Sequence, residues 1–472
     1  MDKYEQFKEY VEITLEKFKD IDKKETIRLV SHLDADGIAA ISIMIRALNL
    51  DNRKYSISIV QQLNKNVIEE LSKEAYNYFV FTDLGSGQLS FIKKILNDRK
   101  VFILDHHQPE EVKLTSNMVH VNPHLFGIDG SKEVSGAGVV YLFAKNINKK
   151  IEDMAHIAII GAIGDIQEDN GFLRLNDEIL ETAIKKENIK VIRGLRIFGA
   201  QTKPLHKVLE YCTDPYIPGV SGSESGAIQF LHQIGIDPKN GAGWKKIVHL
   251  EKEDVKNLVT GIIMRRFNEE KPEDVLGNVY ILSNEEKESP TRDAKEFSTL
   301  LNACGRMGKA SLGIGACLGD KKAKLRAIQN TATYKKEIVN AINWYNENKD
   351  SKSIVKSEGV IIINTEDNIM PTIVGTLASI ISKSNETKEG TFIMGLAQLL
   401  DGTTKVSLRI SGYKNKDVDL RDVIKAVTDK VGGEAGGHKQ AAGALIATEK
   451  EKEFIKAAKE ILTQRAIEEK VV

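Results

Sequence analysis

The sequence predicts an α/β protein in which a parallel-sheet domain is joined by a helical connector to a smaller α/β C-terminal domain. Short β-rich runs alternate with helical stretches over residues 1–165, which is the pattern of a parallel sheet whose strands are linked by helices. The same alternation returns after residue 353, and a long charged segment with a helical pattern, 321–350, lies between the two regions. A length of 472 residues also exceeds what one hydrophobic core usually serves.

Five short apolar runs are the predicted strands of the N-terminal sheet. Each is apolar on both faces, as expected where helices cover both sides of a parallel sheet. The predicted strands are TIRLV (26–30), YSISIV (55–60), YFVFT (78–82), VFIL (101–104) and MVHV (118–121). Helices are expected in the intervals, including 38–48 and 65–74, and an apolar segment with glycines at 152–165 predicts a buried helix.

The second half of the chain is divided by composition. Residues 177–212 have a helical pattern, and a proline- and glycine-rich stretch at 214–226 predicts a loop or a domain edge. Later strands are predicted in GVIIINT (359–365), TFIMGLAQ (391–398) and TKVSLRISG (404–412). We therefore expect an N-terminal domain over 1–215, a helical or mixed region over 216–320, a connector helix over 321–350 and a C-terminal domain over 351–472.

Bulk composition excludes some classes of protein. Sixty-seven basic residues balance 67 acidic ones, which argues against a protein coated in phosphate-binding charge but permits a local basic groove. The three cysteines, Cys212, Cys304 and Cys317, form no CxxC pair, so neither a disulfide framework nor a cysteine zinc site is expected. No run approaches the roughly 20 apolar residues of a membrane span. We expect a cytoplasmic protein without membrane association.

Aspartate and histidine side chains gather where predicted strands end. In an open parallel sheet the carboxyl ends of the strands meet at one edge, so residues distant in sequence can converge there. A single DxD pair, histidine pair or aspartate would be an ordinary turn or cap feature. Their joint occurrence in one α/β unit instead favours a metal site. The candidates are His32, Asp34, Asp36, Asp83, Asp105, His106 and His107 after strands, and Asp165 on the predicted buried helix.

This set of residue types suits phosphodiester hydrolysis. That reaction needs a nucleophile made from water near neutral pH and a counter-charge for the transition state, and two divalent ions roughly 3.5–4 Å apart supply both. Several carboxylates, at least one of them bridging, are needed to hold two such ions. Mixed imidazole and carboxylate ligation favours manganese, zinc or iron over a magnesium site built from oxygen alone.

These residues also carry a resemblance to a known family. The segments SHLDADG, TDLGSG, LDHHQP and GAIGD resemble the four motifs of the DHH phosphoesterase superfamily, in order. The segment GGHKQAAGA resembles the glycine-rich histidine motif of its associated C-terminal domain. Within the superfamily, FGAQTKPLHKVLEYCTDPYIPGVSG (198–222), NPHLFGIDG (122–130) and SGAG (135–138) are similar to archaeal RecJ-like nucleases.

The resemblance implies roles for the clustered residues. One metal would be held by His32, Asp34 and Asp83, and the other by Asp36, Asp83, His106 and Asp165, with Asp83 bridging. Asp105 would orient a histidine, and His107 would face the substrate as a phosphate contact or proton donor. Bacterial RecJ proteins often have aspartate at the position of His32, which would alter metal preference. We expect two divalent ions, with manganese favoured over magnesium.

Further residues are expected to bind substrate phosphate. Ser407 and Arg409 alternate on one face of a predicted strand, and the resemblance makes them a phosphate-binding pair rather than an exposed edge. Gly436 and Gly437 would let backbone N–H groups converge on an anion beside His438. In FSTLLNACGRMG (297–308), the resemblance makes Asn302 and Arg306 contacts to the nucleic-acid backbone, although an ordinary surface arginine is the simpler interpretation of Arg306 from sequence alone.

The resemblance implies a metal-dependent exonuclease that hydrolyses single-stranded DNA or RNA from an end, in DNA replication or repair. One alternative is a phosphodiesterase for short oligonucleotides or cyclic dinucleotides. Another is an inactive scaffold of a replication complex, but every expected metal ligand is present. Single-stranded nucleic acid is the expected partner, and the resemblance also suggests the GINS replication complex. The motifs encode neither the polarity of digestion nor the choice between DNA and RNA.

Overall fold

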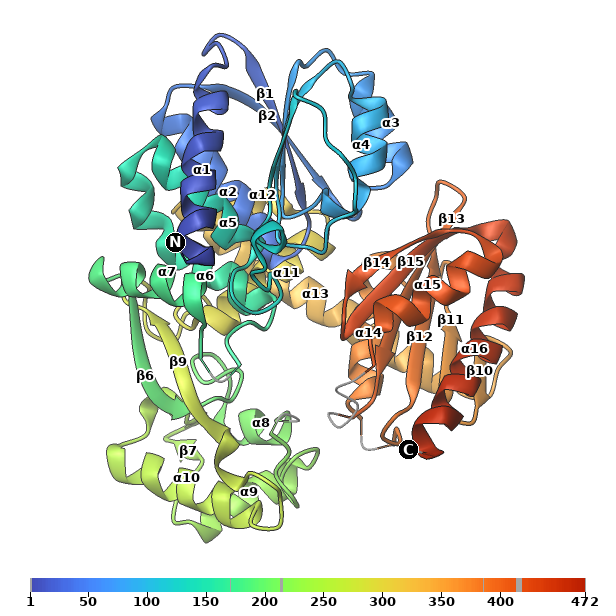
Figure 1. Ribbon diagram of the computed structural model, residues 1–472. Coiled ribbons are helices and arrows are strands. Elements are labelled where there is room, and N and C mark those ends of the chain that lie inside the picture. The colour runs from blue at the N-terminus through green and yellow to red at the C-terminus, as the bar shows by residue number, and fades with distance from the viewer. Residues whose placement is uncertain (1, 170, 213–214, 385, 413–417, 472) are drawn as a thin grey trace. The chain divides into compact units, whose positions relative to one another are not determined.

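The computed structural model describes residues 2–471 except 170, 213–214, 385 and 413–417 (Figure 1). The chain divides into two compact units, Met1–Ile328 and Gln329–Val472. Both contain a sheet with helices packed on it, so the predicted α/β class with a parallel N-terminal sheet and a second sheet domain is confirmed.

A five-stranded parallel sheet forms the centre of the first unit. Its order is β2-β1-β3-β4-β5, and every neighbouring pair is parallel. Strand β2 lies on one side of β1, and β3 lies on the other side. The order in which the chain adds strands to the sheet therefore reverses at β1. Loops leaving β1 and β3 therefore diverge there, which is where open parallel sheets bind ligands. The strands, all close to the predicted runs, are β1 (Thr26–His32), β2 (Lys54–Val60), β3 (Tyr78–Thr82), β4 (Lys100–Leu104) and β5 (Met118–Val121).

Helices cover both faces of this sheet, and strand residues alternate between two cores. Leu29 and Phe102 pack in one core with the larger helix group, while Val30 and Ile103 pack in the other with two short helices. This period of two explains why each strand is apolar throughout. The first group is α1 (Lys3–Lys19), α2 (Ala35–Leu50), α5 (Gly136–Ile147) and α6 (Ala155–Gly164), and the second is α3 (Lys65–Ser72) and α4 (Leu89–Ile95).

The region after α6 differs from the helical segment predicted at 177–212. Helix α7 (Arg174–Lys185) is followed by strand β6 (Ile189–Leu195), which pairs antiparallel with β9 (Leu276–Leu282). The prediction of helix is wrong in its middle because the partner of β6 lies far along the chain, where local periodicity carries no information about it. Between these strands lie α8 (Leu205–Glu210), α9 (Glu224–Gln233), the short strands β7 (Lys239–Asn240) and β8 (Gly243–Trp244), and α10 (Lys252–Arg265).

The segment between β6 and β9 has a core of its own. Apolar side chains of α8, α9 and α10 pack together with Ile217 and Val220, which are fully buried. These two residues lie in the proline- and glycine-rich stretch, so its described part packs into that core. Helices α11 (Ala294–Arg306) and α12 (Ala310–Cys317) then return to the core around α2.

The second unit is a six-stranded mixed sheet of order β10-β11-β12-β13-β15-β14. Only β11 and β12 are parallel, and α14 (Pro371–Ser382) connects them. The glycine-rich segment at 432–444, whose composition alone is typical of a loop, instead forms most of the hairpin of β14 and β15. The elements are α13 (Lys321–Glu347), which contains the boundary between the units, β10 (Ile354–Ser357), β11 (Val360–Asn364), β12 (Phe392–Gln398), β13 (Thr403–Ile410), α15 (Leu420–Val431), β14 (Glu434–His438), β15 (Ala441–Ala447) and α16 (Glu451–Val471).

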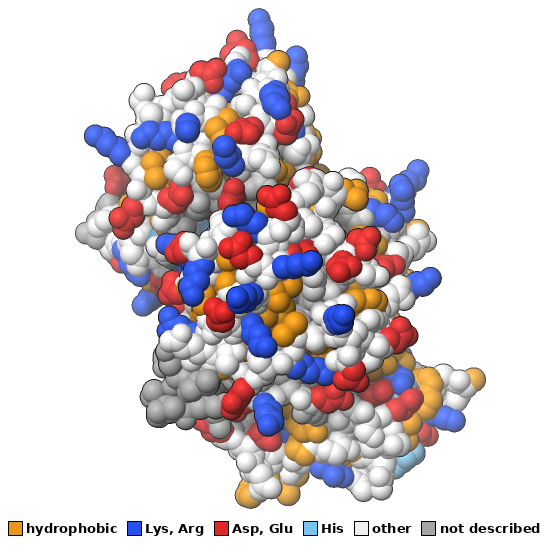
Figure 2. All heavy atoms as spheres, turned by 90° about the vertical axis from the view of Figure 1, so that its right-hand side faces the viewer, with side chains coloured by type: hydrophobic (Ala, Val, Ile, Leu, Met, Phe, Trp, Pro, Cys, Tyr) orange, Lys and Arg blue, Asp and Glu red, His pale blue; other side chains and the backbone are white. Residues whose placement is uncertain are grey.

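The surface agrees with the balanced composition. Acidic and basic side chains are interspersed over the face of the molecule drawn in Figure 2. Within the described ranges, no helix combines the length and the apolar composition that crossing a bilayer requires.

Phe102 provides a test of the packing beneath the metal-ligand candidates. Its ring lies in a T-shaped arrangement with Phe18 at 5.4 Å and also packs against Phe143. We expect Phe102→Ala to lower the free energy of unfolding by about 3–5 kcal/mol, because it leaves a cavity in a fully buried site. Phe267→Ala is the matched control, since that ring is 74% exposed. Urea denaturation followed by circular dichroism measures both, and equal losses would contradict the assigned core.

Candidate metal centre

The switch point of the first sheet collects the predicted metal ligands. His32 is the last residue of β1, and Asp34 caps α2 by accepting a hydrogen bond from the Gly37 N–H at 3.0 Å. Asp83 follows β3, and its φ of 59° lies in the left-handed region. Such a conformation is uncommon for a residue with a side chain, although aspartate adopts it more readily than most, and examples cluster at functional sites.

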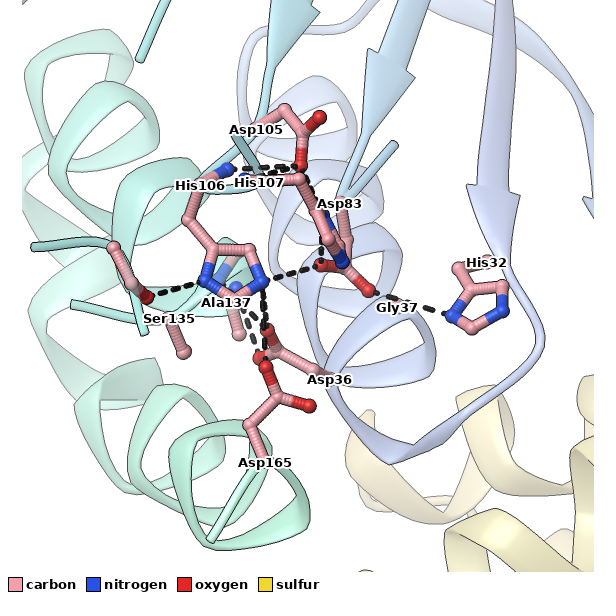
Figure 3. Close-up of polar contacts among 12 residues, drawn as sticks. His32, Asp36, Gly37, Asp83, Asp105, His106, His107, Ser135, Ala137 and Asp165 are labelled. Carbon is pink, nitrogen blue, oxygen red and sulfur yellow. Dashed lines mark hydrogen bonds and ion pairs between the residues drawn. The ribbon is translucent and has the colours of Figure 1, made fainter. Parts of the chain in front are cut away.

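The candidate ligand atoms form three groups that lie close together (Figure 3): His32, Asp34 and Asp83; Asp36, His106 and Asp165; and Asp83, Asp105, His106 and His107. In the first, His32 Nδ1 lies 2.8 Å from Asp34 Oδ2 and 3.9 Å from Asp83 Oδ2. In the second, His106 Nε2 lies 3.3 Å from both Asp83 Oδ1 and Asp165 Oδ2. Asp36 Oδ2 completes this group at 3.7 Å from the same nitrogen. The structure thus brings together all six residues predicted as metal ligands.

The electrostatics of this cluster suit a divalent cation. Burial raises the pKa of Asp36, Asp83 and Asp165 above the ordinary aspartate value, and the charge of Asp36 raises it further for the other two. Burial opposes a positive charge on His106, yet its hydrogen bond with Asp83 and the charges of Asp165 and Asp83 raise its pKa well above the usual range. Buried like charges are costly unless a cation compensates them.

Asp83 shows most directly that the negative charge of this cluster needs a compensating cation. Apart from the neighbouring histidines, neither of its buried carboxylate oxygens has a hydrogen-bond partner among the residues that the structure describes. A buried carboxylate normally accepts several hydrogen bonds or coordinates a metal. The donor set of imidazole nitrogens and carboxylate oxygens fits manganese, and also zinc or iron. The groups containing Asp83 could therefore hold metal ions.

Asp34 and Asp36 are held differently by the backbone. Burial raises the pKa of Asp34, but the charge of His32 and hydrogen bonds from His32 and Gly37 outweigh it, so the net shift is downward. Asp36 accepts hydrogen bonds from the Gly136 N–H at 2.7 Å and the Ala137 N–H at 3.0 Å, at the start of α5. A helix N-terminus favours a negative charge at this place.

Glycines let the helices approach these carboxylates. A Cβ at Gly136 would lie 2.3 Å from Asp83 Oδ1, and a Cβ at Gly161 would lie 2.4 Å from Asp36 Oδ1. Both distances are too short for any side chain. The SGAG and GAIGD segments therefore place glycine where α5 and α6 close around the cluster.

The ring of His106 is oriented by a second contact. Its Nδ1 donates to the Gly130 carbonyl at 2.6 Å, and the same oxygen accepts a hydrogen bond from Gln167 Nε2 at 3.0 Å. When the ring is neutral, this donation leaves the lone pair of Nε2 facing the carboxylates. Such fixing of the tautomer by a backbone carbonyl is common for metal-binding histidines.

Asp105 is hydrogen-bonded to His107, and with Asp83, His106 and His107 it forms a further group of side chains that could hold a metal ion. Its Oδ1 accepts a hydrogen bond from His107 Nδ1 at 2.7 Å, and its Oδ2 accepts one from the Ser86 N–H at 2.9 Å. Burial raises the pKa of Asp105, but the charge and hydrogen bond of His107 dominate and hold it below the ordinary value. Asp105 is therefore an anionic anchor for His107, whose side chain is 27% exposed.

A buried polar network behind this pair was missed from the sequence. Ser86 Oγ lies 2.8 Å from His120 Nε2 and accepts a hydrogen bond from Asn122 Nδ2 at 2.8 Å. Asn122 Nδ2 also donates to the His107 carbonyl at 2.8 Å. Burial lowers the pKa of His120 to about 4, so this ring is neutral at pH 7. A histidine inside the apolar run MVHV was the available signal, because a buried polar group needs a partner.

The LNACGR segment lies against the loop that carries Asp34 and Asp36. Asn302 Oδ1 accepts a hydrogen bond from the Ala35 N–H at 3.0 Å. A Cβ at Gly305 would lie 1.6 Å from the Leu33 carbonyl oxygen, so α11 touches this loop directly. Asn302 thus supports the first turn of α2, and half-buried Arg306 ends α11.

The other predicted phosphate-binding residues belong to the second unit: Ser407, Arg409, Gly436, Gly437 and His438. Ser407 on β13 pairs with Gly443 on β15, which pairs with Gly436 on β14, so the three form one row across the sheet. Arg409 Nε donates to Ser379 Oγ at 2.9 Å, and its Nη1 donates to the Leu408 carbonyl at 2.8 Å.

The glycine hairpin beside this row contains a residue with positive φ. Gly437 has a φ of 123°, which only glycine adopts readily, and His438 ends β14. The structure therefore brings the serine and the glycine motif together within one sheet.

Three family models match successive parts of the chain. They are the DHH family N-terminal domain (residues 26–162), the DHH-CID domain (197–279) and the DHHA1 domain (357–464). An uncharacterized protein of Methanocaldococcus jannaschii is 32% identical, over 96% of this chain and 99% of that protein.

Solved structures show the same fold at low identity. RecJ of Thermus thermophilus, in complex with Mn²⁺, matches 97% of this chain with a TM-score of 0.57 and 16% identity, and this chain spans 55% of that protein. CDC45 of Entamoeba histolytica matches 98% of both chains with a TM-score of 0.63 and 13% identity. The chain belongs to the DHH family and has a RecJ-like fold.

Proposed function

We propose that this protein is a two-metal phosphodiesterase that removes nucleotides from the end of single-stranded DNA or RNA, in DNA replication or repair. The observation that carries the proposal is the buried group of aspartates and histidines that meets at Asp83. Carboxylates brought together in one buried place repel one another, and divalent cations bound among them would offset that repulsion.

The first two groups of ligand atoms support two metal positions that would share Asp83. His32 and Asp34 would complete one position, while Asp36, His106 and Asp165 would complete the other. When bound, the ions supply a nucleophile derived from water and neutralise charge that develops on the phosphate. Imidazole ligands favour manganese, with magnesium as a second choice. The T. thermophilus RecJ structures contain Mn²⁺ in one case and Mg²⁺ in another.

His107 would act on the substrate. Its Nδ1 donates to Asp105 Oδ1 at 2.7 Å, which orients the ring, and the resemblance of the LDHHQP segment gives this histidine the role of a phosphate contact or of a proton donor to the leaving oxygen. Asp105 would hold the ring in this orientation, as a carboxylate does for a catalytic histidine. The network of Ser86, His120 and Asn122 would keep this pair in place.

Substrate phosphate would be bound by the second unit. Arg409 is hydrogen-bonded to Ser379, and Ser407 lies in one row with Gly443 and Gly436, so backbone N–H groups of the glycine hairpin would add to these side chains in binding an anion. Asn302 and Arg306 would extend recognition along the strand beyond its terminal nucleotide. Such extra contacts favour a polynucleotide over the alternative of a dinucleotide or cyclic dinucleotide.

A replication-complex role is a second candidate, which the match to CDC45 favours. That likeness is one of fold, and the clustered ligands support an active enzyme, for which association with replication proteins such as GINS would be an additional role. An inactive scaffold would not require the donor set around Asp83.

Asp83→Ala is expected to lose more than about 10³-fold in rate, because it removes the carboxylate shared by both metal positions. Bound manganese, counted by elemental analysis, should fall as well. Asp98→Ala is the matched control, since that side chain is 66% exposed. Manganese should support at least as much activity as magnesium, and chelation should abolish it. Near wild-type cleavage by Asp83→Ala in manganese would show the two-metal assignment to be wrong.

Arg409→Ala and His438→Ala are expected to slow cleavage about ten- to a hundredfold each, since one charge-assisted hydrogen bond contributes roughly 1.5–3 kcal/mol. The metal content should not change, because neither residue belongs to a group of candidate metal ligands. Lys430→Ala, an exposed cation of the same unit, is the control. Metal depletion in either test variant would place that residue among the ligands instead.

Substrate choice separates the exonuclease from its smaller-substrate alternative. We expect cleavage of one overhang among a 5′-overhang, a 3′-overhang, a blunt duplex and a dinucleotide at equal concentration. Binding should weaken with salt by a slope of roughly −0.7 per phosphate contacted, as for other single-strand complexes. If the protein hydrolyses the dinucleotide but cuts neither overhang, the exonuclease proposal is overturned in favour of the smaller-substrate alternative.

A further inference from the structure

The second unit contains a hollow of about 800 Å³ that is separate from the residues discussed so far. It is bounded by the second half of α13, the segment that leads into α14, and the turn between β12 and β13. None of the predicted phosphate-binding residues lines it. Its size is within the range of sites that bind ligands or peptide side chains, about 300–1,000 Å³.

The wall and the lip of this hollow are apolar. Trp344 lies on the α13 side, while Ile369 and Ile373 are buried beneath. Two large apolar side chains remain in water at the lip, where Met370 is 40% exposed and Leu400 is 109% exposed. Exposed apolar side chains grouped around a hollow are typical of interaction sites.

The turn that carries Leu400 does not itself require leucine. Asp401 Oδ1 accepts hydrogen bonds from the Thr403 N–H at 3.1 Å and from the Thr403 hydroxyl at 2.6 Å, and Gly402 has a φ of 79°. Aspartate and glycine therefore determine the turn conformation. A polar residue at position 400 would form the same turn without exposing a large apolar side chain to water. The leucine at this position therefore indicates a contact with something outside the core of this unit.

The charged residues of the lining are all acidic. Glu337, Asp367 and Asp401 border the hollow, and none of the lining residues is lysine, arginine or histidine. In the part of the chain that the structure describes, Glu337 and Asp367 make no ion pair or side-chain hydrogen bond. Elsewhere in this unit carboxylates do pair, as Glu386 does with Lys349 at 2.9 Å. The hollow therefore has uncompensated negative charge around an apolar wall.

We propose that this hollow binds a basic amphipathic segment of a protein partner. An apolar side chain of that segment would pack against Trp344 and Leu400, and lysine or arginine side chains would lie beside Glu337 and Asp367. Apolar anchors supply most of the binding energy in such grooves, and the charges around them select the partner. Nucleic acid is disfavoured here because the carboxylates repel phosphate.

Tryptophan fluorescence provides the test in the whole protein. The chain has two tryptophans, so Trp244→Phe leaves Trp344 as the sole reporter. The probe is a synthetic leucine–lysine amphipathic helix of about 18 residues, or five helical turns, and the same peptide with glutamate for lysine is its counterpart. We expect saturable change in Trp344 emission with the lysine peptide, weakened by salt, and none with the glutamate peptide.

Two variants locate the binding. The double variant Glu337→Lys and Asp367→Lys, and separately Leu400→Ser, should each weaken the lysine peptide about tenfold or more. Asp429→Lys with Glu449→Lys is the matched charge control, because both residues are exposed in the same unit and outside the lining. Unchanged affinity in both test variants would overturn the proposal, as would equal binding of the glutamate peptide. Sedimentation without peptide measures self-association of the protein. If Trp344 emission changes as the protein self-associates, the hollow binds a second copy of the chain and the proposal of a basic partner segment is overturned.

Discussion

Burial of several carboxylates at one point is the constraint on which the first unit depends. Asp36, Asp83 and Asp165 come from three parts of the chain and meet where β1 and β3 end. Their mutual repulsion has to be offset by other contacts, and the surrounding structure supplies them: the N-terminus of α5 donates to Asp36, and His106 approaches all three. The glycines of α5 and α6, and the left-handed backbone of Asp83, follow from this crowding. A divalent cation would complete the compensation.

Local sequence pattern was sufficient for the parts that depend on local physics. The five parallel strands are short apolar runs, and the ligand candidates directly follow them, so both the sheet and its functional edge could be predicted. Strand β6 could not, because its stability comes from pairing with β9, which lies far along the chain. The same reasoning applies to the hairpin of β14 and β15, where tertiary pairing overrides a glycine-rich composition.

The site residues also divide into those that local sequence identifies and those that only the fold brings together. Motif residues such as His106 could be recognised by type and place, whereas Ser86 and Asn122 act through hydrogen bonds that only the folded chain brings together. Asn302 illustrates the difference. The resemblance made it a contact to nucleic acid, and the structure adds that its side-chain oxygen holds the Ala35 N–H beside the metal-ligand candidates. A residue in that position can influence substrate and metal ligands together, through one loop.

The whole chain has a net charge of zero, yet the second unit has two local environments that differ in the sign of their charge. On one side Arg409, Ser407 and the glycine hairpin offer donors suited to phosphate, and elsewhere Glu337 and Asp367 surround an apolar hollow that has no cation in its lining. Phosphate and a basic peptide would each be repelled from the other's site, so the two surfaces can act without competition. If both proposals hold, this protein would bind substrate and a protein partner at once. The proposed partner site shares no residue with those proposed to serve catalysis.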